Sequence, residues 1–339
     1  MRTAVYYNNN DIRIEERPIP KIGDDEILVR AISSGICGSD VLEWYRIKKA
    51  PIVLGHEISG VIEAVGRNVK NFKSGDRVFV SHHVPCNKCR YCRAGNHTVC
   101  STLQSTNFDP GGFSEYIRVP KINVDFGTFI LPEKMSFDEG TFIEPLGCVV
   151  RGQRNAGFKA GQTVLIMGSG ISGLLHILLA KTNGAEKIIA TDINEYKLKK
   201  AKECGADFVI NAKDDVVKKI FENTENRGVD LVIVCAGAFS VFEQALKCVD
   251  KAGSILCFAT SEPGRELSVP INEFWKKSIT LLSSYAAAPN DLREAMELLS
   301  FKKIDVNSLI THRLPLNEIG QGFKLMARAS ESLKVIITF

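Results

Sequence analysis

The 339-residue sequence lacks any uninterrupted apolar segment long enough to span a membrane, and Met1 to Asn8 contain no apolar core of a secretion signal. It also lacks long runs of basic residues, because the net charge is +4 and the two signs are interspersed. These absences argue against membrane insertion, secretion and binding to nucleic acid or a membrane surface. We therefore expect a cytoplasmic protein with no nucleic acid and no membrane among its partners.

Internal repeats and low-complexity segments are absent as well. With 45% hydrophobic and 24% charged residues, the composition is that of an ordinary globular protein. The length is sufficient for two domains and a large core that needs no disulfide bonds. In a reducing compartment, the ten cysteines are expected to be thiols or metal ligands.

Four cysteines lie in one short stretch with C-x2-C-x2-C-x7-C spacing: Cys86, Cys89, Cys92 and Cys100. Four thiolates at this spacing can surround one tetrahedral zinc ion with no open position, which predicts a structural zinc site. An iron–sulfur cluster is an alternative, but the ferredoxin pattern has a shorter last gap followed by proline. A metal-free loop and a nucleic-acid-binding zinc module are further alternatives, the latter because Lys88, Arg90 and Arg93 lie here.

Two glycine-bounded turns after apolar segments carry a second set of metal-binding side chains. They provide the thiolate of Cys37, the imidazole of His56 and the carboxylate of Glu57. This donor set suits zinc better than magnesium or calcium, and catalytic zinc takes three protein ligands and leaves one position open. Alone, these residues are weak evidence, because a cysteine and a histidine in loops are more often unrelated than co-ligands.

A further carboxylate lies in a helix that the sequence predicts to begin at Ser136, where Ser136 and Glu139 have the form of a capping box. We expect this helix to carry Glu144, which precedes Pro145 among apolar residues. A carboxylate that faces inward is costly without a partner. A metal ion would be such a partner.

The first third of the chain contains short strands and turns, which indicate a β-rich domain. From Gln162 onward, apolar strands alternate with amphipathic helices, which predicts an α/β domain with a doubly wound parallel sheet. Helices over 290–300 and 316–329 and a strand over 334–339 follow, and we expect them to return to the first domain. Two domains are therefore predicted: residues 1–147 with 286–339, and residues 148–285.

The α/β region contains a dinucleotide-binding fingerprint in which G-x-G-x-x-G follows a strand and opens a helix. The predicted cofactor-binding residues are Gly168, Gly170, Ile171, Ser172, Gly173 and Asp192. The glycines allow a tight turn and close approach of a pyrophosphate to the helix N-terminus. Asp192 can accept hydrogen bonds from ribose hydroxyls and would repel a 2′-phosphate, which favours NAD over NADP. A glycine-rich turn without a nucleotide is the alternative.

Taken in order, these motifs resemble those of the zinc-dependent medium-chain dehydrogenase/reductase superfamily over nearly the whole chain. The matching segments are Cys37-Gly38-Ser39-Asp40, Gly55-His56-Glu57, the four-cysteine stretch, Glu144-Pro145-Leu146, and the glycine loop with Asp192. The resemblance implies a β-rich, GroES-like catalytic domain, a Rossmann cofactor domain and an active site between them. It also implies two zinc ions per chain, NAD as cofactor, and a homotetramer or homodimer.

The resemblance assigns roles to the matched residues. Cys37 and His56 would bind the catalytic zinc, and Glu57 would bind it directly or through water. Asp40 would orient His56, as ligating imidazoles usually require. Ser39 would hold the substrate hydroxyl and pass its proton onward.

Glu144 is informative because classical alcohol dehydrogenases of this superfamily have a cysteine as the corresponding zinc ligand. A Glu-Pro segment here is typical of polyol, sugar-alcohol and threonine dehydrogenases. Cys148 is a rival ligand, because it lies four residues further along the same helix face.

The chain departs from the family pattern in two places. Leu42 occupies the position where many relatives have a histidine that relays the proton to solvent. His82 and His83 are candidates for that relay, although a structural role is the alternative. Residues 283–288 lack the arginine with which polyol dehydrogenases hold sugar hydroxyls, so ordinary sorbitol specificity is not expected.

Together these features predict a zinc-dependent, NAD-linked dehydrogenase that oxidises a secondary alcohol to a ketone. A polyol, sugar or cyclitol is the first expectation for the substrate, a β-hydroxy amino acid such as threonine the second, and a simple secondary alcohol the third. A nucleotide-binding sensor that keeps the fold without catalysis is the non-enzymatic alternative. A zinc-free quinone or enoyl reductase is disfavoured by the metal-binding residues and by Asp192.

Overall fold

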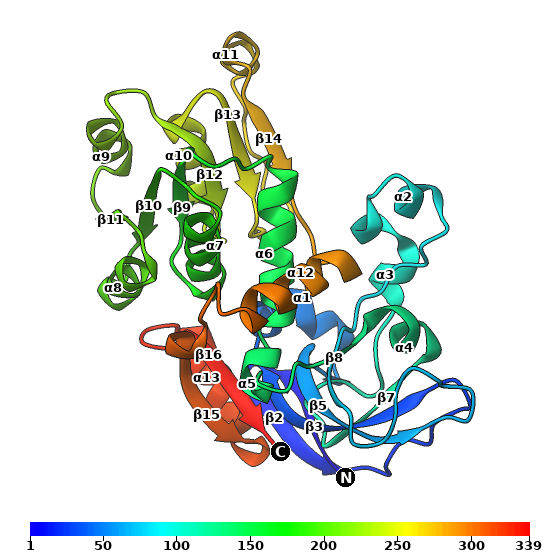
Figure 1. Ribbon diagram of the computed structural model, residues 1–339. Coiled ribbons are helices and arrows are strands. Elements are labelled where there is room, and N and C mark those ends of the chain that lie inside the picture. The colour runs from blue at the N-terminus through cyan, green and yellow to red at the C-terminus, as the bar shows by residue number, and fades with distance from the viewer. The chain divides into compact units, whose positions relative to one another are not determined.

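The computed structural model describes residues 1–339, which divide into two compact units (Figure 1). Unit 1 contains residues 1–147 and 286–339, and unit 2 contains residues 148–285. Each unit has its own sheet and its own buried apolar core. No helix combines the length and the apolar character that crossing a bilayer requires.

The strands of unit 1 are β1 (Arg2–Asn8), β2 (Asp11–Glu16), β3 (Ile27–Gly35), β4 (Ile52–Val53), β5 (Glu57–Val65), β6 (Arg77–Val80), β7 (Tyr116–Val119), β8 (Thr128–Ile130), β15 (Ile310–Pro315) and β16 (Lys334–Thr338). Its helices are η1 (Gly38–Val41), α1 (Glu43–Arg46), η2 (Ile47–Lys49), α2 (Arg90–Arg93), η3 (His97–Val99), α3 (Ser101–Ser105), α4 (Lys121–Gly127), α5 (Phe137–Gly140), α12 (Pro289–Ser300), η4 (Asn307–Leu309), η5 (Leu316–Glu318) and α13 (Ile319–Arg328). Helix α6 (Ile143–Asn155) begins in unit 1 and ends in unit 2.

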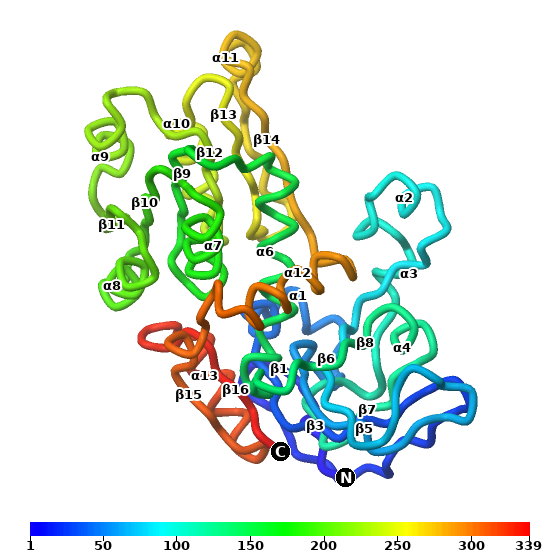
Figure 2. Tube along the Cα trace, in the orientation of Figure 1, coloured from blue at the N-terminus to red at the C-terminus, as the bar shows by residue number.

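Unit 1 is built around a seven-stranded sheet of order β15-β16-β3-β5-β6-β8, in which β7 also pairs with β3. A small sheet of order β2-β1-β4 accompanies it. Strand β16 pairs antiparallel with β3, with Ile336 opposite Gly35. The last strand of the chain therefore lies beside one of the first, as Figure 2 shows.

Unit 2 contains a six-stranded parallel sheet of order β11-β10-β9-β12-β13-β14. Its strands are β9 (Thr163–Met167), β10 (Lys187–Asp192), β11 (Phe208–Asn211), β12 (Val229–Val234), β13 (Val249–Cys257) and β14 (Thr280–Ser283), and its helices are α7 (Ile171–Thr182), α8 (Glu195–Cys204), α9 (Val216–Asn223), α10 (Phe239–Cys248) and α11 (Ile271–Lys277).

Helices cover both faces of this parallel sheet. Leu165 of β9 belongs to the same buried cluster as Phe242 of α10. The next residue, Ile166, points to the opposite face, where it lies against Gly173 of α7. The predicted combination of a β-rich domain with a doubly wound parallel sheet is confirmed.

One expected helix differs from the prediction. The capping box of Ser136 and Glu139 is present, but the helix that it starts, α5, ends at Gly140. Glu144 is instead the second residue of α6. The reason is Pro145, which lacks a backbone N–H and is tolerated only in the first turn of a helix, so a new helix has to begin just before it.

Candidate active site

The first turn of the site is shaped by an N-terminal capping box. Cys37 follows β3 and caps η1, where its sulfur accepts the backbone N–H of Ser39 at 3.4 Å. Asp40 completes the box by accepting the backbone N–H of Cys37 at 3.0 Å. The segment Cys-Gly-Ser-Asp thus fixes the direction of the thiol through its own local hydrogen bonds.

The second turn depends on a glycine just before β5. Gly55 has a φ of +89°, which favours glycine. A Cβ at this position would lie 2.8 Å from the backbone nitrogen of Phe113. This close passage of two backbones positions His56 at the start of the strand that carries Glu57.

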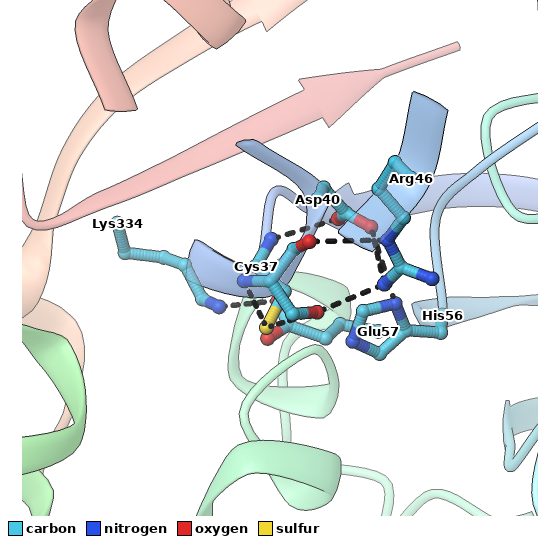
Figure 3. A network of polar contacts seen from close by, with 7 residues as sticks. Cys37, Asp40, Arg46, His56, Glu57 and Lys334 are labelled. Atoms are coloured by element: carbon cyan, nitrogen blue, oxygen red, sulfur yellow. Dashed lines mark hydrogen bonds and ion pairs between the residues drawn. The ribbon is translucent and has the colours of Figure 1, made fainter. Parts of the chain in front are cut away.

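The two turns bring three ligand atoms together. The donor atoms of Cys37, His56 and Glu57 lie within 4.8 Å of one another (Figure 3). A sulfur, a nitrogen and a carboxylate oxygen this close form a set that fits zinc. The imidazole Nδ1 of His56 lies 3.5 Å from the carboxylate of the fully buried Asp40, which leaves Nε2 available to a metal.

Charges around the imidazole control its protonation. Burial alone would lower the pKa of His56, but Asp40 and Cys37 raise it well above its usual value. Burial opposes ionisation of Asp40 as well, yet His56 and Arg46 lower the pKa of that carboxyl. Asp40 and Cys37 thus favour the protonated imidazole, and a zinc ion would compete with that proton for the ring nitrogen.

Glu57 has a partner that the sequence did not suggest. Its carboxylate forms an ion pair with Lys334 of β16, and both side chains are fully buried. A Cβ at Gly35 would collide with the Glu57 carboxylate and crowd the Lys334 ammonium, so the absence of a side chain at Gly35 makes room for the pair. Lys334 also lies 5.3 Å from the ring centroid of Phe142. One oxygen of Glu57 is thus bound to a cation of the chain itself.

Glu144 does not join this group in the structure. Its side chain is buried near the start of α6, and its oxygens lie outside the set of mutually close donor atoms. The rival Cys148 is also outside that set. That Glu144 binds the zinc stays a prediction.

Arg46 at the end of α1 is a second residue that the sequence did not indicate. Its side chain, 14% exposed, donates from Nη2 to the hydroxyl of Ser39 at 2.9 Å and from Nε to the Ser39 carbonyl at 3.0 Å. Nη2 also lies 3.3 Å from Asp40. The Ser39 hydroxyl is itself 3.4 Å from the Cys37 sulfur. Arg46 therefore places a positive charge beside the serine expected to hold the substrate.

His82 and His83 lie next to this group. The ring of His82 stacks on that of His83 at 3.7 Å and is 4.8 Å from that of His56. Burial, together with the positive charges of His56, Arg46 and Lys49, lowers the pKa of His83 to about 4. Burial and His83 also hold the pKa of His82 well below its usual value. Both rings are neutral at physiological pH.

The four cysteines of the expected structural zinc site form a second cluster. Sulfur–sulfur distances are 3.5 Å for Cys89–Cys92, 3.6 Å for Cys86–Cys100 and 4.0 Å for Cys86–Cys92. Thiolates around one zinc ion are about 3.8 Å apart, so the arrangement fits this metal. Burial opposes ionisation of Cys100, but backbone N–H groups lower its pKa to about 6. His97 is half-buried, and its Nδ1 lies 3.2 Å from the Gly95 carbonyl oxygen.

The glycine loop of unit 2 fits a dinucleotide. Gly168, with a φ of +100°, ends β9, and Gly170 caps α7 with open space around its Cα. A Cβ at Gly173 would collide with the carbonyl of Gly168, so only glycine allows the helix to approach the strand. Asp192, at the end of β10, accepts the N–H of Ser169 at 2.8 Å and so braces the loop.

Two domain families match parts of the chain. The alcohol dehydrogenase GroES-like domain matches residues 23–125, and the zinc-binding dehydrogenase domain matches residues 172–300. The chain belongs to the family of zinc-dependent medium-chain dehydrogenases, as predicted. It is therefore an oxidoreductase of the alcohol dehydrogenase type, with zinc and a nicotinamide dinucleotide as cofactors.

The relatives span the whole chain. Sorbitol dehydrogenase of Bacillus subtilis (strain 168) is 33% identical over 349 residues, covering 99% of this chain and 97% of the relative. L-threonine 3-dehydrogenase of Bacillus velezensis is 34% identical over 346 residues and covers 98% of both chains. Among solved structures, galactitol-1-phosphate dehydrogenase from Escherichia coli is similar with a TM-score of 0.88 and 30% identity, and both chains are covered completely.

Proposed function

We propose that the enzyme oxidises a secondary hydroxyl of a polyol, sugar or cyclitol to a ketone with NAD. The observation that carries this proposal is the close grouping of Cys37, His56 and Glu57 beside the Ser39 hydroxyl. Relatives named as sorbitol and galactitol-1-phosphate dehydrogenases, and the Glu144-Pro145 segment, favour a substrate with several hydroxyl groups.

In this proposal Cys37, His56 and Glu144 would hold the zinc, and Glu57 would bind it directly or through water. When bound, the zinc lowers the pKa of a substrate hydroxyl and NAD takes up the hydride. Asp40 keeps the His56 ring in the orientation that presents Nε2. Ser39 would accept a hydrogen bond from the substrate hydroxyl and pass that proton onward to solvent by releasing its own O–H proton, and Arg46 fixes the serine oxygen.

Metal content and turnover test the proposal together. We expect two zinc ions per chain by elemental analysis and formation of NADH with at least one member of a panel of sugar alcohols, inositols, their phosphates, L-threonine and simple secondary alcohols. One zinc ion per chain without turnover would instead support the nucleotide-binding sensor. Turnover confined to L-threonine or simple alcohols would contradict the proposed substrate class.

The cofactor preference rests on Asp192. Replacing Asp192 with asparagine keeps an acceptor oxygen for the Ser169 N–H but removes the negative charge. We expect the ratio of kcat/KM with NAD to that with NADP to fall roughly tenfold, since about 1.4 kcal/mol corresponds to that factor. Asp207→Asn is the matched control, because Asp207 also accepts a backbone N–H, from Ile188 at 2.8 Å, and lies at the next strand. An unchanged ratio would refute the role of Asp192.

We propose that the enzyme is a homo-oligomer whose subunits pair through β14, which gives a homodimer or, with a second interface, a homotetramer. β14 is an edge strand, and Leu281 on it is 38% exposed. Trp275 of α11, which precedes it, is 74% exposed. Exposed apolar edges of this kind invite pairing with another strand.

A charge on this edge should separate the subunits. Leu281→Lys is expected to lower the molar mass in light scattering, because lysine on an edge strand opposes strand pairing. Ile130→Lys is the matched control, since Ile130 lies on β8, the edge strand of the unit 1 sheet, and is also exposed. A Leu281→Lys protein of unchanged molar mass would place the interface elsewhere.

A further inference from the structure

The free donors of Arg46 indicate that the site is built for an anion. Nε and Nη2 are used by Ser39 and Asp40, whereas Nη1 takes part in no hydrogen bond or ion pair. In Figure 3 this second terminal nitrogen points away from Asp40. Because the guanidinium is locked by its other contacts, its two remaining N–H groups are already oriented for an acceptor.

A second cation, Lys49, lies nearby, and unlike Arg46 it has no carboxylate partner. The Lys49 ammonium is 5.7 Å from the ring centroid of Tyr45, and the Arg46 guanidinium carbon is 4.7 Å from the same centroid. Lys49 forms no ion pair with any residue of the structure. Asp40 is shared by Arg46 and His56, and Lys49 adds a positive charge that has no carboxylate partner.

Both cations act on the same part of the site. Both lie by the ring of Tyr45, and Arg46 also contacts Asp40, which lies 3.5 Å from His56. The Ser39 hydroxyl connects Arg46 with Cys37: it accepts a hydrogen bond from Arg46 and lies 3.4 Å from the Cys37 sulfur. An anionic group held here would belong to a molecule whose hydroxyl can reach Ser39.

We propose that the substrate is a phosphate monoester of a polyol, sugar or cyclitol, and that Arg46 and Lys49 bind its phosphate. This inference rests on the proposed function and narrows its substrate class. A phosphate monoester carries close to two negative charges and three acceptor oxygens, which suits a guanidinium fork together with an ammonium. It also gives the site a means of orienting the substrate without the arginine that residues 283–288 lack.

A β-hydroxy amino acid fits these surroundings less well. Its carboxylate could use the same cations, but its ammonium group needs a carboxylate of its own. Asp40 is already engaged by His56 and Arg46, and Glu57 is engaged by Lys334. Neither of these two carboxylates is therefore free to pair with the ammonium.

The test compares each phosphate ester with its own free polyol: galactitol-1-phosphate with galactitol, a sorbitol phosphate with sorbitol, and an inositol phosphate with inositol. For the zinc-loaded enzyme with NAD, we expect kcat/KM for at least one ester to exceed that of its free polyol by about tenfold or more. Lys49→Met should lower kcat/KM for the ester about tenfold, mainly through KM, and leave the free polyol unchanged. Lys49→Arg should keep the preference for the phosphate ester over the free polyol.

Lys48→Met is the matched control, because Lys48 is the adjacent exposed lysine and contacts neither Tyr45 nor an acidic residue. Equal kcat/KM for ester and free polyol, an unaltered preference in Lys49→Met, or a preference for L-threonine would overturn the inference. Binding of inorganic phosphate, measured by calorimetry, separates the two proposals. If no alcohol is oxidised but phosphate binds and Lys49→Met weakens that binding, the proposed function fails while the anion site stands.

Discussion

Cys37→Ser is expected to contain one zinc ion per chain instead of two and to lose alcohol oxidation by roughly 10²–10³-fold or more. Serine keeps the size of the side chain and can still cap η1, but its hydroxyl does not ionise near neutral pH and is a poor zinc ligand. Binding of NAD should persist, because the glycine loop belongs to unit 2, which has its own core. The measurements are elemental analysis, steady-state kinetics and titration with NADH.

Two further variants distinguish between Glu144 and Cys148 as the remaining protein ligand of the catalytic zinc. Glu144→Gln should also reduce the zinc content and turnover, because a neutral amide is a poorer zinc ligand than a carboxylate. Cys148→Ser should keep both zinc ions and most activity. The opposite pattern would make Cys148 the ligand. Turnover that survives Cys37→Ser, with unaltered zinc content, would remove the catalytic zinc site as we propose it.

Lys334→Met is expected to lower the free energy of unfolding of unit 1 by about 3–5 kcal/mol, because it leaves the buried carboxylate of Glu57 without its counter-charge. Methionine resembles the lysine stem in volume, so little of the loss should come from packing. A double variant that combines Lys334→Met with Glu57→Gln should recover much of the stability, since no buried charge then remains unpaired. Denaturant unfolding followed by a probe in unit 1 measures both effects.

A control in the same unit is an ion pair whose carboxylate is buried but whose lysine is exposed. Lys302 forms an ion pair with Glu139, but its side chain is 54% exposed. Lys302→Met should therefore cost less than about 1 kcal/mol. If Lys334→Met lowered the free energy of unfolding no more than Lys302→Met, burial of the Glu57–Lys334 pair would not contribute to stability.

The sheet of unit 2 could be predicted because its strands can be recognised from their local sequence pattern. Thr163–Met167 is a continuous apolar run, as expected for a parallel strand covered on both faces, and it leads directly into the glycine loop. Strand β15 (Ile310–Pro315) was not predicted, because His312 and Arg313 interrupt its apolar pattern and it lies at the edge of its sheet. Local patterns thus identify buried strands better than edge strands.

The sequence predicted the types of metal-binding side chains in the site but not the contacts that support them. Cys37 and His56 are 19 residues apart and stand in recognisable turns. Lys334 is 277 residues from Glu57, and no periodicity reports such a pairing. A lysine at the start of an otherwise apolar strand was the one available signal. Arg46 gave no signal, because its contact with Ser39 depends on how two short helices follow one another.

The route of the chain through β16 has a consequence during protein synthesis. Unit 2 is continuous, so all its residues have emerged from the ribosome before translation reaches Lys334. Glu57, by contrast, gains its partner Lys334 only when β16 has been synthesised, and until then its carboxylate must stay hydrated. The contacts around Cys37 and Glu57 are therefore complete only when nearly the whole of unit 1 has been made. A nascent chain halted before β16 would carry a finished nucleotide-binding unit and an open, unfinished metal site.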